Sequence, residues 1–253
     1  MHYGNFGNHQ NSSKYRQNKE SSILLVSSYL VVTVMEISVE ITSEVYQGQF
    51  GEFTITKDDR LSVIVYRSAL AIAALCFSIG ATLVLWQPSN PDVLSWLTWL
   101  YLGFMIAIGV ALWTIHIYLA VLHRALQIFW AIGAIATVSV MFYFPESLAI
   151  AIYDHQLALL GIGFSFAALT GIFFKETFCF NRFETKFLTP LLPVLILGHL
   201  VNILPISIER GLLGAWAILF LIFAIRKVIQ AIPPDIGDKS VFAYLKAEKQ
   251  RSL

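Results

Sequence analysis

Residues 175–202, KETFCFNRFETKFLTPLLPVLILGHLVN, decide the fold. The first half mixes basic and acidic side chains with Phe178, Phe180 and Phe183, whereas the second half has no acidic side chain and no basic one except His199. A charged, aromatic segment that runs directly into an apolar one is typical of the place where a chain enters a membrane. We therefore expect a loop at one membrane surface, followed by a spanning segment.

The composition extends this reading to most of the chain. Of the 253 residues, 57% are hydrophobic and 13% are charged, whereas a soluble domain has about 25% charged residues. The net charge of +1 gives no polybasic surface, which excludes a nucleic-acid partner. Cys76 lies in an apolar segment and Cys179 in a charged one, so they form neither a disulfide framework nor a metal-binding pair. Lipid is therefore the predicted solvent.

Long segments without Asp, Glu, Lys or Arg predict the membrane spans. They are residues 68–91, 93–123, 125–145, 155–174, 187–208 and 211–225, and the last extends to Ile232 if Arg226 and Lys227 snorkel. A spanning helix needs about 20 apolar residues. We expect an all-α polytopic membrane protein with six transmembrane helices. Its parts are a polar, partly disordered N-terminal segment (1–61), a six-helix domain (62–232) and a tail (233–253).

The distribution of basic residues predicts the orientation. With six spans and both termini inside, every Lys and Arg except Arg210 lies on the inner side, as the positive-inside rule requires. We therefore expect both termini in the cytoplasm. Near the N-terminus, polar and apolar residues alternate at 35–42 and around Phe53, with Gly48 and Gly51 between, which favours a small cytoplasmic hairpin. Residues 116–130 contain no Gly, Pro or Asn, so a tight bend or short interfacial helix is expected there.

His199 and Asn202 are the first candidate site. His199 follows Lys186 by more than three helical turns, which places it near the middle of the membrane, and Asn202 shares its helical face. Polar groups at that depth face the bundle interior. Two interpretations stay open. The pair either binds a metal, a tetrapyrrole or a solute, or it makes a structural hydrogen bond between helices.

His116 and His123 are the second candidate. They are candidate interfacial ligands that share a face if residues 116–123 form one helix. They flank the expected inner boundary beside Arg124, where histidines are common without a ligand role. No cofactor is expected, although a His-ligated haem, pigment or metal stays an alternative. A metalloenzyme motif is absent from the sequence.

The charged segment at 175–186 is the third candidate. Phe178, Cys179, Phe180 and Arg182 combine aromatic and cationic side chains, which are enriched in the cores of protein interfaces. We expect a cytoplasmic loop that binds a partner, in addition to the lipid bilayer. Cys179 could be redox-active, but a lone Cys among apolar residues is more often inert.

Four segments resemble a known family: EVYQGQFGEFTIT (44–56), VYRSALAIAAL (65–75), HIYLAVLHRALQIFW (116–130) and KETFCFNRFETKFLTPLLPVLILGH (175–199). They are similar to an uncharacterised family of integral membrane proteins, a domain of unknown function found in cyanobacteria among others, over about residues 44–230. The resemblance implies a multi-pass protein of the plasma or thylakoid membrane. It implies no particular activity.

The predicted function is a non-enzymatic scaffold or assembly factor for a larger membrane protein complex, acting through the cytoplasmic face. The alternative is a small-solute transporter or channel around His199 and Asn202. No glycine-rich phosphate loop, nucleophile motif or acidic residue within the predicted spans supports hydrolase or kinase chemistry.

Overall fold

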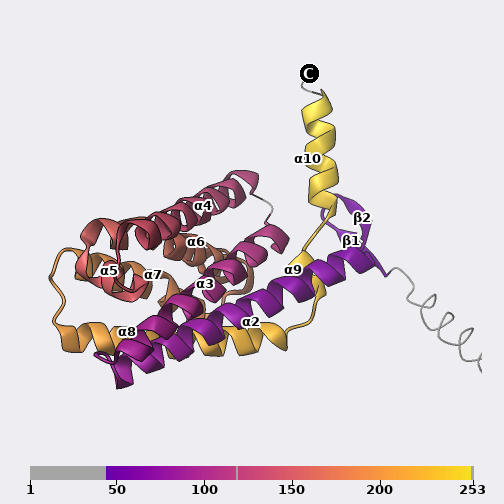
Figure 1. Cartoon of the computed structure of the whole chain (residues 1–253). Coiled ribbons are helices and arrows are strands. Elements are labelled where there is room, and N and C mark those ends of the chain that lie inside the picture. Colours follow the sequence, from indigo (N-terminus) through magenta and orange to yellow (C-terminus); the bar gives the residue numbers. More distant parts are fainter. Residues whose placement is uncertain (1–43, 118, 252–253) are drawn as a thin grey trace, which may run out of the picture.

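The computed structural model describes residues 44–117 and 119–251 and shows a bundle of long helices with a hairpin and a helical tail at one end (Figure 1). The strands are β1 (Val45–Gly48) and β2 (Gly51–Thr54), and the helices are α2 (Lys57–Trp86), α3 (Pro91–Thr114), α4 (Ala120–Tyr143), α5 (Leu148–Asp154), α6 (Gln156–Phe180), α7 (Phe183–Leu200), α8 (Ile206–Val228), α9 (Pro233–Ile236) and α10 (Ser240–Arg251). The disorder predicted near the N-terminus and the alternation at 35–42 lie outside the described residues.

We name the two ends of the bundle by their contents. The basic end holds the hairpin, the α3–α4 and α6–α7 connections and the tail. The opposite end holds the connections α2–α3, α4–α6 (through α5) and α7–α8. These names assign no side of the membrane.

Five helices in the described part of the chain are long and apolar enough to cross a membrane, namely α2, α3, α4, α6 and α8. The fold is therefore an all-α polytopic bundle. The predicted span at 187–208 is divided: α7 ends at Leu200 and α8 begins at Ile206. Helix α7 has 18 residues and carries Glu184 in its first turn, and it is not among the five. It packs against α6 and α8, and its status as a sixth span stays a prediction.

Side chains at the helix starts fix several of these boundaries. Thr56 and Asp59 form a capping box at the start of α2, in which each side chain accepts a hydrogen bond from the backbone of the other residue. Asn90 caps α3 and precedes Pro91, a residue suited to a first helical position. The expected bend after α3 is present, since α3 ends at Thr114 and α4 begins at Ala120.

Aromatic side chains fill the middle of the bundle. Trp216, Phe220 and Phe223 of α8 are fully buried against Phe173 of α6. The Phe173 ring meets each of the other three edge-on, at centroid distances of 5.3–5.9 Å. Edge-to-face pairs add to the gain from burial. This packing leaves the centre between α6 and α8 filled by side chains.

Helices α4 and α6 approach each other closely at three glycines, Gly133, Gly161 and Gly171. A Cβ at Gly133 would lie 2.0 Å from Oγ of Ser165, and one at Gly171 would lie 2.1 Å from a methyl group of Leu126. Small residues allow membrane helices to pack this closely. At Gly163, by contrast, the nearest atom is 3.7 Å away. The close contact between these helices therefore depends on Gly133, Gly161 and Gly171.

The hairpin and the tail form one unit at the basic end, which we call the basic-end module (β1, β2, α9 and α10). A hairpin is present at the predicted turn, with Gly48 opposite Gly51; its first strand is β1, whereas the strand predicted at 35–42 lies outside the described residues. The backbone N–H of Gln49 donates to the Asp238 carboxylate at 2.6 Å, and that of Phe50 donates to Oγ of Ser240 at 3.0 Å. Figure 1 shows α10 projecting away from the bundle and turned across the direction of α2. The side chains of Asp238 and Ser240 at the start of α10 therefore hold the hairpin turn.

The Asp238 contact predicts a pH dependence of the module. Hydrogen bonds from the Gln49 amide and from Ser240 hold the pKa of Asp238 below its ordinary value of 3.8. A lowered folded-state pKa means that the carboxylate stabilises docking fully above pH 3.8 and loses this contribution as the pH falls through the folded-state pKa. Hydrogen exchange at the hairpin amides, corrected for the intrinsic rate, should therefore accelerate on acidification.

A variant separates this effect from general acid unfolding. Asp238→Asn should show the faster exchange already at neutral pH, whereas Asp58→Asn, at an exposed position near the same end, should exchange like the wild type. Equal protection in Asp238→Asn and in the wild type would contradict the assignment.

Candidate functional site

The structure places His199 at the opposite end of the bundle. Helix α7 ends one residue later, at Leu200, so the predicted position near mid-membrane is corrected. Nδ1 of His199 lies 2.8 Å from Oε1 of Glu209 on α8, and the ring centroid lies 4.8 Å from that of Tyr153 on α5. His199 thus links α5, α7 and α8 at the opposite end of the bundle.

Asn202 does not share a helical face with His199. Its backbone adopts a left-handed conformation with φ 53°, and its side chain is exposed beyond the end of α7. The backbone N–H of Asn202 donates to the carbonyl of His199, and that of Ile203 to the carbonyl of Gly198. The chain turns here because asparagine tolerates this conformation better than most residues do.

His116 and His123 lie at the basic end but on different elements. His116 belongs to the connection after α3, and His123 is in the first turn of α4. Nε2 of His123 faces the carbonyl oxygen of Leu112 at 2.7 Å, one of the carbonyls left open at the end of α3. Burial lowers the pKa of His116. Within residues 44–117 and 119–251, no three His, Cys, Asp or Glu side chains are grouped to hold a metal ion.

The predicted partner loop is almost entirely helical. Helix α6 continues to Phe180 and α7 starts at Phe183, so only Asn181 and Arg182 connect them. Phe178 and Cys179 are exposed, whereas Arg182 is buried. Phe180 turns towards the cations, with its ring 4.2 Å from Nζ of Lys227. The four candidate residues therefore divide into an outward pair and an inward pair.

The inward pair belongs to a cluster of charged side chains that we call the buried charge network. At its centre, Nζ of Lys227 lies 2.6 Å from Oε2 of Glu176 and 2.5 Å from Oδ1 of Asp235. Lys227 and Glu176 are both fully buried. The hydroxyl of Tyr66 and the ammonium of Lys175 each lie 3.1 Å from the other oxygen of Glu176. One lysine thus joins α6, α8 and α9.

Arg67 ties α2 to the same centre. Its guanidinium lies 2.6 Å from Oδ2 of Asp235 and also donates to the backbone carbonyls of Gln230 and Ala231. These carbonyls follow the end of α8 at Val228, where the helix dipole is negative. Arg67 therefore both neutralises a buried acid and caps a helix end.

A second part of the buried charge network includes α7. Glu184 is buried and accepts from Arg226 at 2.6 Å and from Arg182 at 3.3 Å. Arg182 also donates to the side chain of Gln230. Buried charges are tolerated only when they are paired and hydrogen-bonded, and each of these groups has such partners. The network consequently joins α2, α6, α7, α8 and α9 at the basic end.

The individual members of this network were not identifiable from the sequence. Glu176 is far from Lys227, and Arg67 is far from Asp235, so no local spacing links them. The sequence does show that acidic and basic residues are concentrated together at the predicted inner ends of the helices. Such residues more often lie in water at the membrane boundary than in a buried cluster. In the structure, Asp235 of α9 pairs with Lys227 and Arg67 and so joins these charges into a buried cluster.

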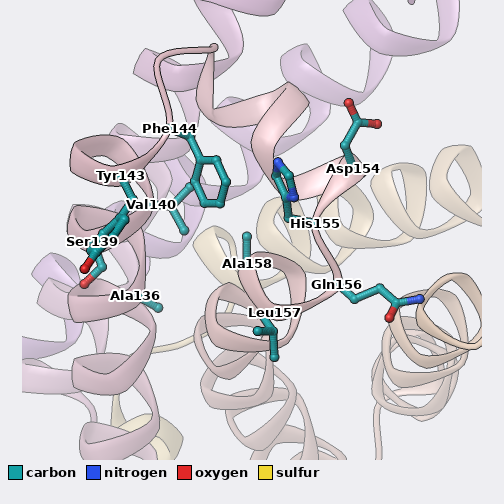
Figure 2. Close-up of a pocket in the computed structure, with 10 residues that line it drawn as sticks. All are labelled: Ala136, Ser139, Val140, Tyr143, Phe144, Asp154, His155, Gln156, Leu157 and Ala158. Carbon is teal, nitrogen blue, oxygen red and sulfur yellow. The ribbon is translucent and has the colours of Figure 1, made fainter.

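The opposite end has an open pocket of about 700 Å³ between the end of α4 and the α5–α6 junction. Figure 2 shows the rings of Phe144 and His155 beside each other in its lining, where they stack with centroids 4.2 Å apart. Nε2 of His155 lies 3.1 Å from Oε1 of Glu146. Asp154 and Gln156 add polar groups to the same wall. These side chains are exposed and show no arrangement of nucleophile and base.

The apolar spans and the bundle define the protein as a polytopic integral membrane protein. The chain belongs to the family described as uncharacterized integral membrane protein (DUF2301), whose model matches residues 110–244. A Haemophilus influenzae protein described as uncharacterized is 28% identical over 189 residues, which cover 73% of this chain and 91% of that protein. No solved structure matches. The family resemblance read from the four segments is confirmed, whereas a cyanobacterial source stays a prediction.

Proposed function

We propose that the protein is a non-enzymatic scaffold or assembly factor that binds a larger membrane protein complex through its basic end. The observation that carries this proposal is an exposed aromatic pair on the basic-end module. The rings of Phe50 and Tyr244 stack with centroids 4.1 Å apart, and both side chains remain more than 40% exposed. Leu245 is exposed beside them. Aromatic side chains of this kind are enriched at protein interfaces.

The attachment of the module supports the proposal. Asp235 on α9 belongs to the buried charge network, and Lys239 lies 2.6 Å from Asp59 near the start of α2. Ile236 packs with Ile55 and Val63 in a small apolar cluster. A surface held in place binds with a smaller loss of conformational entropy than a flexible tail does. The module therefore suits docking.

The proposal includes six spans, with the basic end and both termini in the cytoplasm, in the plasma or thylakoid membrane. Lys and Arg are concentrated at the basic end, and α7 runs from the basic end to the opposite end. If α7 spans, Cys179 before it and a cysteine at Ser207 after it must face different sides.

Cysteine accessibility tests this topology in a Cys76→Ala background. A membrane-impermeant maleimide should label Ser207→Cys, in a Cys179→Ser chain, in intact cells or vesicles of known orientation. It should label Cys179 only after permeabilisation. Labelling of both positions from the same side would contradict six spans, and labelling with the sides exchanged would contradict the orientation.

Migration on a native gel tests the docking proposal. After gentle solubilisation of its own membranes, the tagged wild-type protein should comigrate with a large complex, and Tyr244→Ser combined with Leu245→Ser should abolish comigration. The matched control is Tyr143→Ser with Leu157→Ser, because these are an exposed tyrosine and leucine at the opposite end. Wild-type protein that migrates alone, or equal loss in both pairs, would contradict docking through the module.

The second candidate function is transport of a small solute, favoured by the His199–Glu209 pair at 2.8 Å. A protonatable pair at a helix end can gate a solute path. Buried aromatic side chains around Trp216 and Phe173 fill the centre of the bundle, so transport is less well supported than docking. If it is right, His199→Ala changes solute flux at unchanged expression, and Asn202→Ala is the neighbouring comparison. A coloured or metal-containing preparation would instead favour a His-ligated cofactor.

A further inference from the structure

We propose that an apolar cavity in the half of the bundle nearer the opposite end holds a hydrocarbon chain of a membrane lipid. The cavity has a volume of about 290 Å³, at the lower edge of the range for ligand pockets, about 300–1,000 Å³. Five elements line it: α2, α3, α5, α6 and α8. This site is separate from the basic-end module and from the buried charge network, and it adds a ligand to the proposed docking function.

The lining is almost wholly apolar. Phe77 and Val84 of α2, Leu97 and Leu100 of α3, and Leu159 of α6 contribute most of one wall. All five are only half-buried by the protein, although they lie in segments that form membrane spans. Each therefore has apolar surface that a chain could cover through van der Waals contacts.

The hydroxyl group of Tyr101 at the cavity wall is already engaged. It lies 3.3 Å from Oγ of Ser165 and 3.3 Å from Oγ1 of Thr137. A buried water needs several polar partners, and apolar cavities without them stay dry. Water is thus a poor occupant, and so is a polar solute.

The position of the cavity indicates which kind of molecule occupies it. Its walls are spans of an integral membrane protein, so the surrounding solvent is the hydrocarbon of the bilayer. Helix α5 contributes Leu148, Ala149 and Ile152 to the lining of the cavity. Its volume suits a single acyl or isoprenoid chain and is too small for a complete lipid with its headgroup.

The test uses a phosphatidylcholine that carries a diazirine near the end of one acyl chain. The full-length protein is reconstituted with this lipid and irradiated, and the labelled residues are mapped by mass spectrometry. We expect labelling at cavity-lining leucines such as Leu97, Leu100 and Leu159. Labelling confined to outward-facing residues such as Ile106 and Ile218, which are more than 60% exposed, would overturn the proposal.

A substitution that fills the cavity with a larger side chain provides a second test. Ala81 lines the cavity, and Ala81→Leu should remove most of the labelling at the cavity positions, because the larger side chain occupies the space of the lipid chain. Labelling at Ile106 should not change. Ala215→Leu, at an exposed alanine of α8, is the matched control and should leave both unchanged. Undiminished cavity labelling in a folded Ala81→Leu protein would overturn the proposal, and if that variant does not fold, the wild-type map decides.

Discussion

Lys227→Met is expected to be among the most destabilising single substitutions in the described chain. It leaves Glu176 and Asp235, which share the Lys227 ammonium at 2.6 and 2.5 Å, buried without their common cation. Removing one partner of a buried ion pair typically costs about 3–5 kcal/mol. For a chain of this size, that corresponds to a fall of roughly 10 °C in the unfolding temperature. The temperature at which half of the detergent-solubilised protein loses its monodisperse peak measures this fall.

Two variants show whether the effect comes from the network. Lys186→Met removes an exposed lysine at the same end and should change stability by no more than about 0.5 kcal/mol. Glu176→Gln combined with Lys227→Met removes both charges of one pair, and its destabilisation should be smaller than the sum of the single effects. If Lys227→Met were as stable as Lys186→Met, the network would not hold the basic end together.

Gly133→Ala is expected to separate α4 from α6. The added Cβ would lie 2.0 Å from Oγ of Ser165 and 2.7 Å from its backbone nitrogen, and a backbone atom cannot move aside without its helix. Overpacking of this kind costs about 1–3 kcal/mol, which exceeds the gain of up to about 1 kcal/mol from replacing a helical glycine. The same heating assay should show a lower unfolding temperature.

The comparison variant is Gly163→Ala on α6, where the nearest atom is a methyl group of Ile196 at 3.7 Å. That distance is an ordinary contact, so only the helix-propensity gain remains and the unfolding temperature should rise slightly. Opposite shifts in the two variants are therefore expected. A rise in both would show that α4 and α6 do not approach each other closely at Gly133.

The helical bundle could be predicted from the sequence because the hydropathy and length of each span are properties of one continuous segment. Five of the six predicted spans correspond to long apolar helices, and the break before His123 and the hairpin around Gly48 also correspond to observed features. The prediction was wrong about where the fifth segment ends. Its apolar run continues to Ile208, but Asn202 and Pro205 turn the chain before that point.

The candidate site was much less predictable, because it depends on contacts between distant segments. Arg182 and Phe180 were placed in a partner-binding loop, yet Arg182 pairs with Glu184 and Phe180 covers Lys227. Lys227 in turn pairs with Asp235 on α9, a contact between segments that no local pattern predicts. The exposed surface available to a partner lies instead on α10 and the hairpin, where Phe50 and Tyr244 meet. No pattern in the sequence relates these two residues.

The most direct test of docking through the basic-end module is photo-crosslinking in native membranes. A photoreactive amino acid is placed at Leu245 on α10 or, as the matched position, at Leu157 at the opposite end, both exposed leucines. Docking predicts a discrete high-mass product from position 245 that position 157 does not give. No product from position 245, or the same product from both positions, would contradict it.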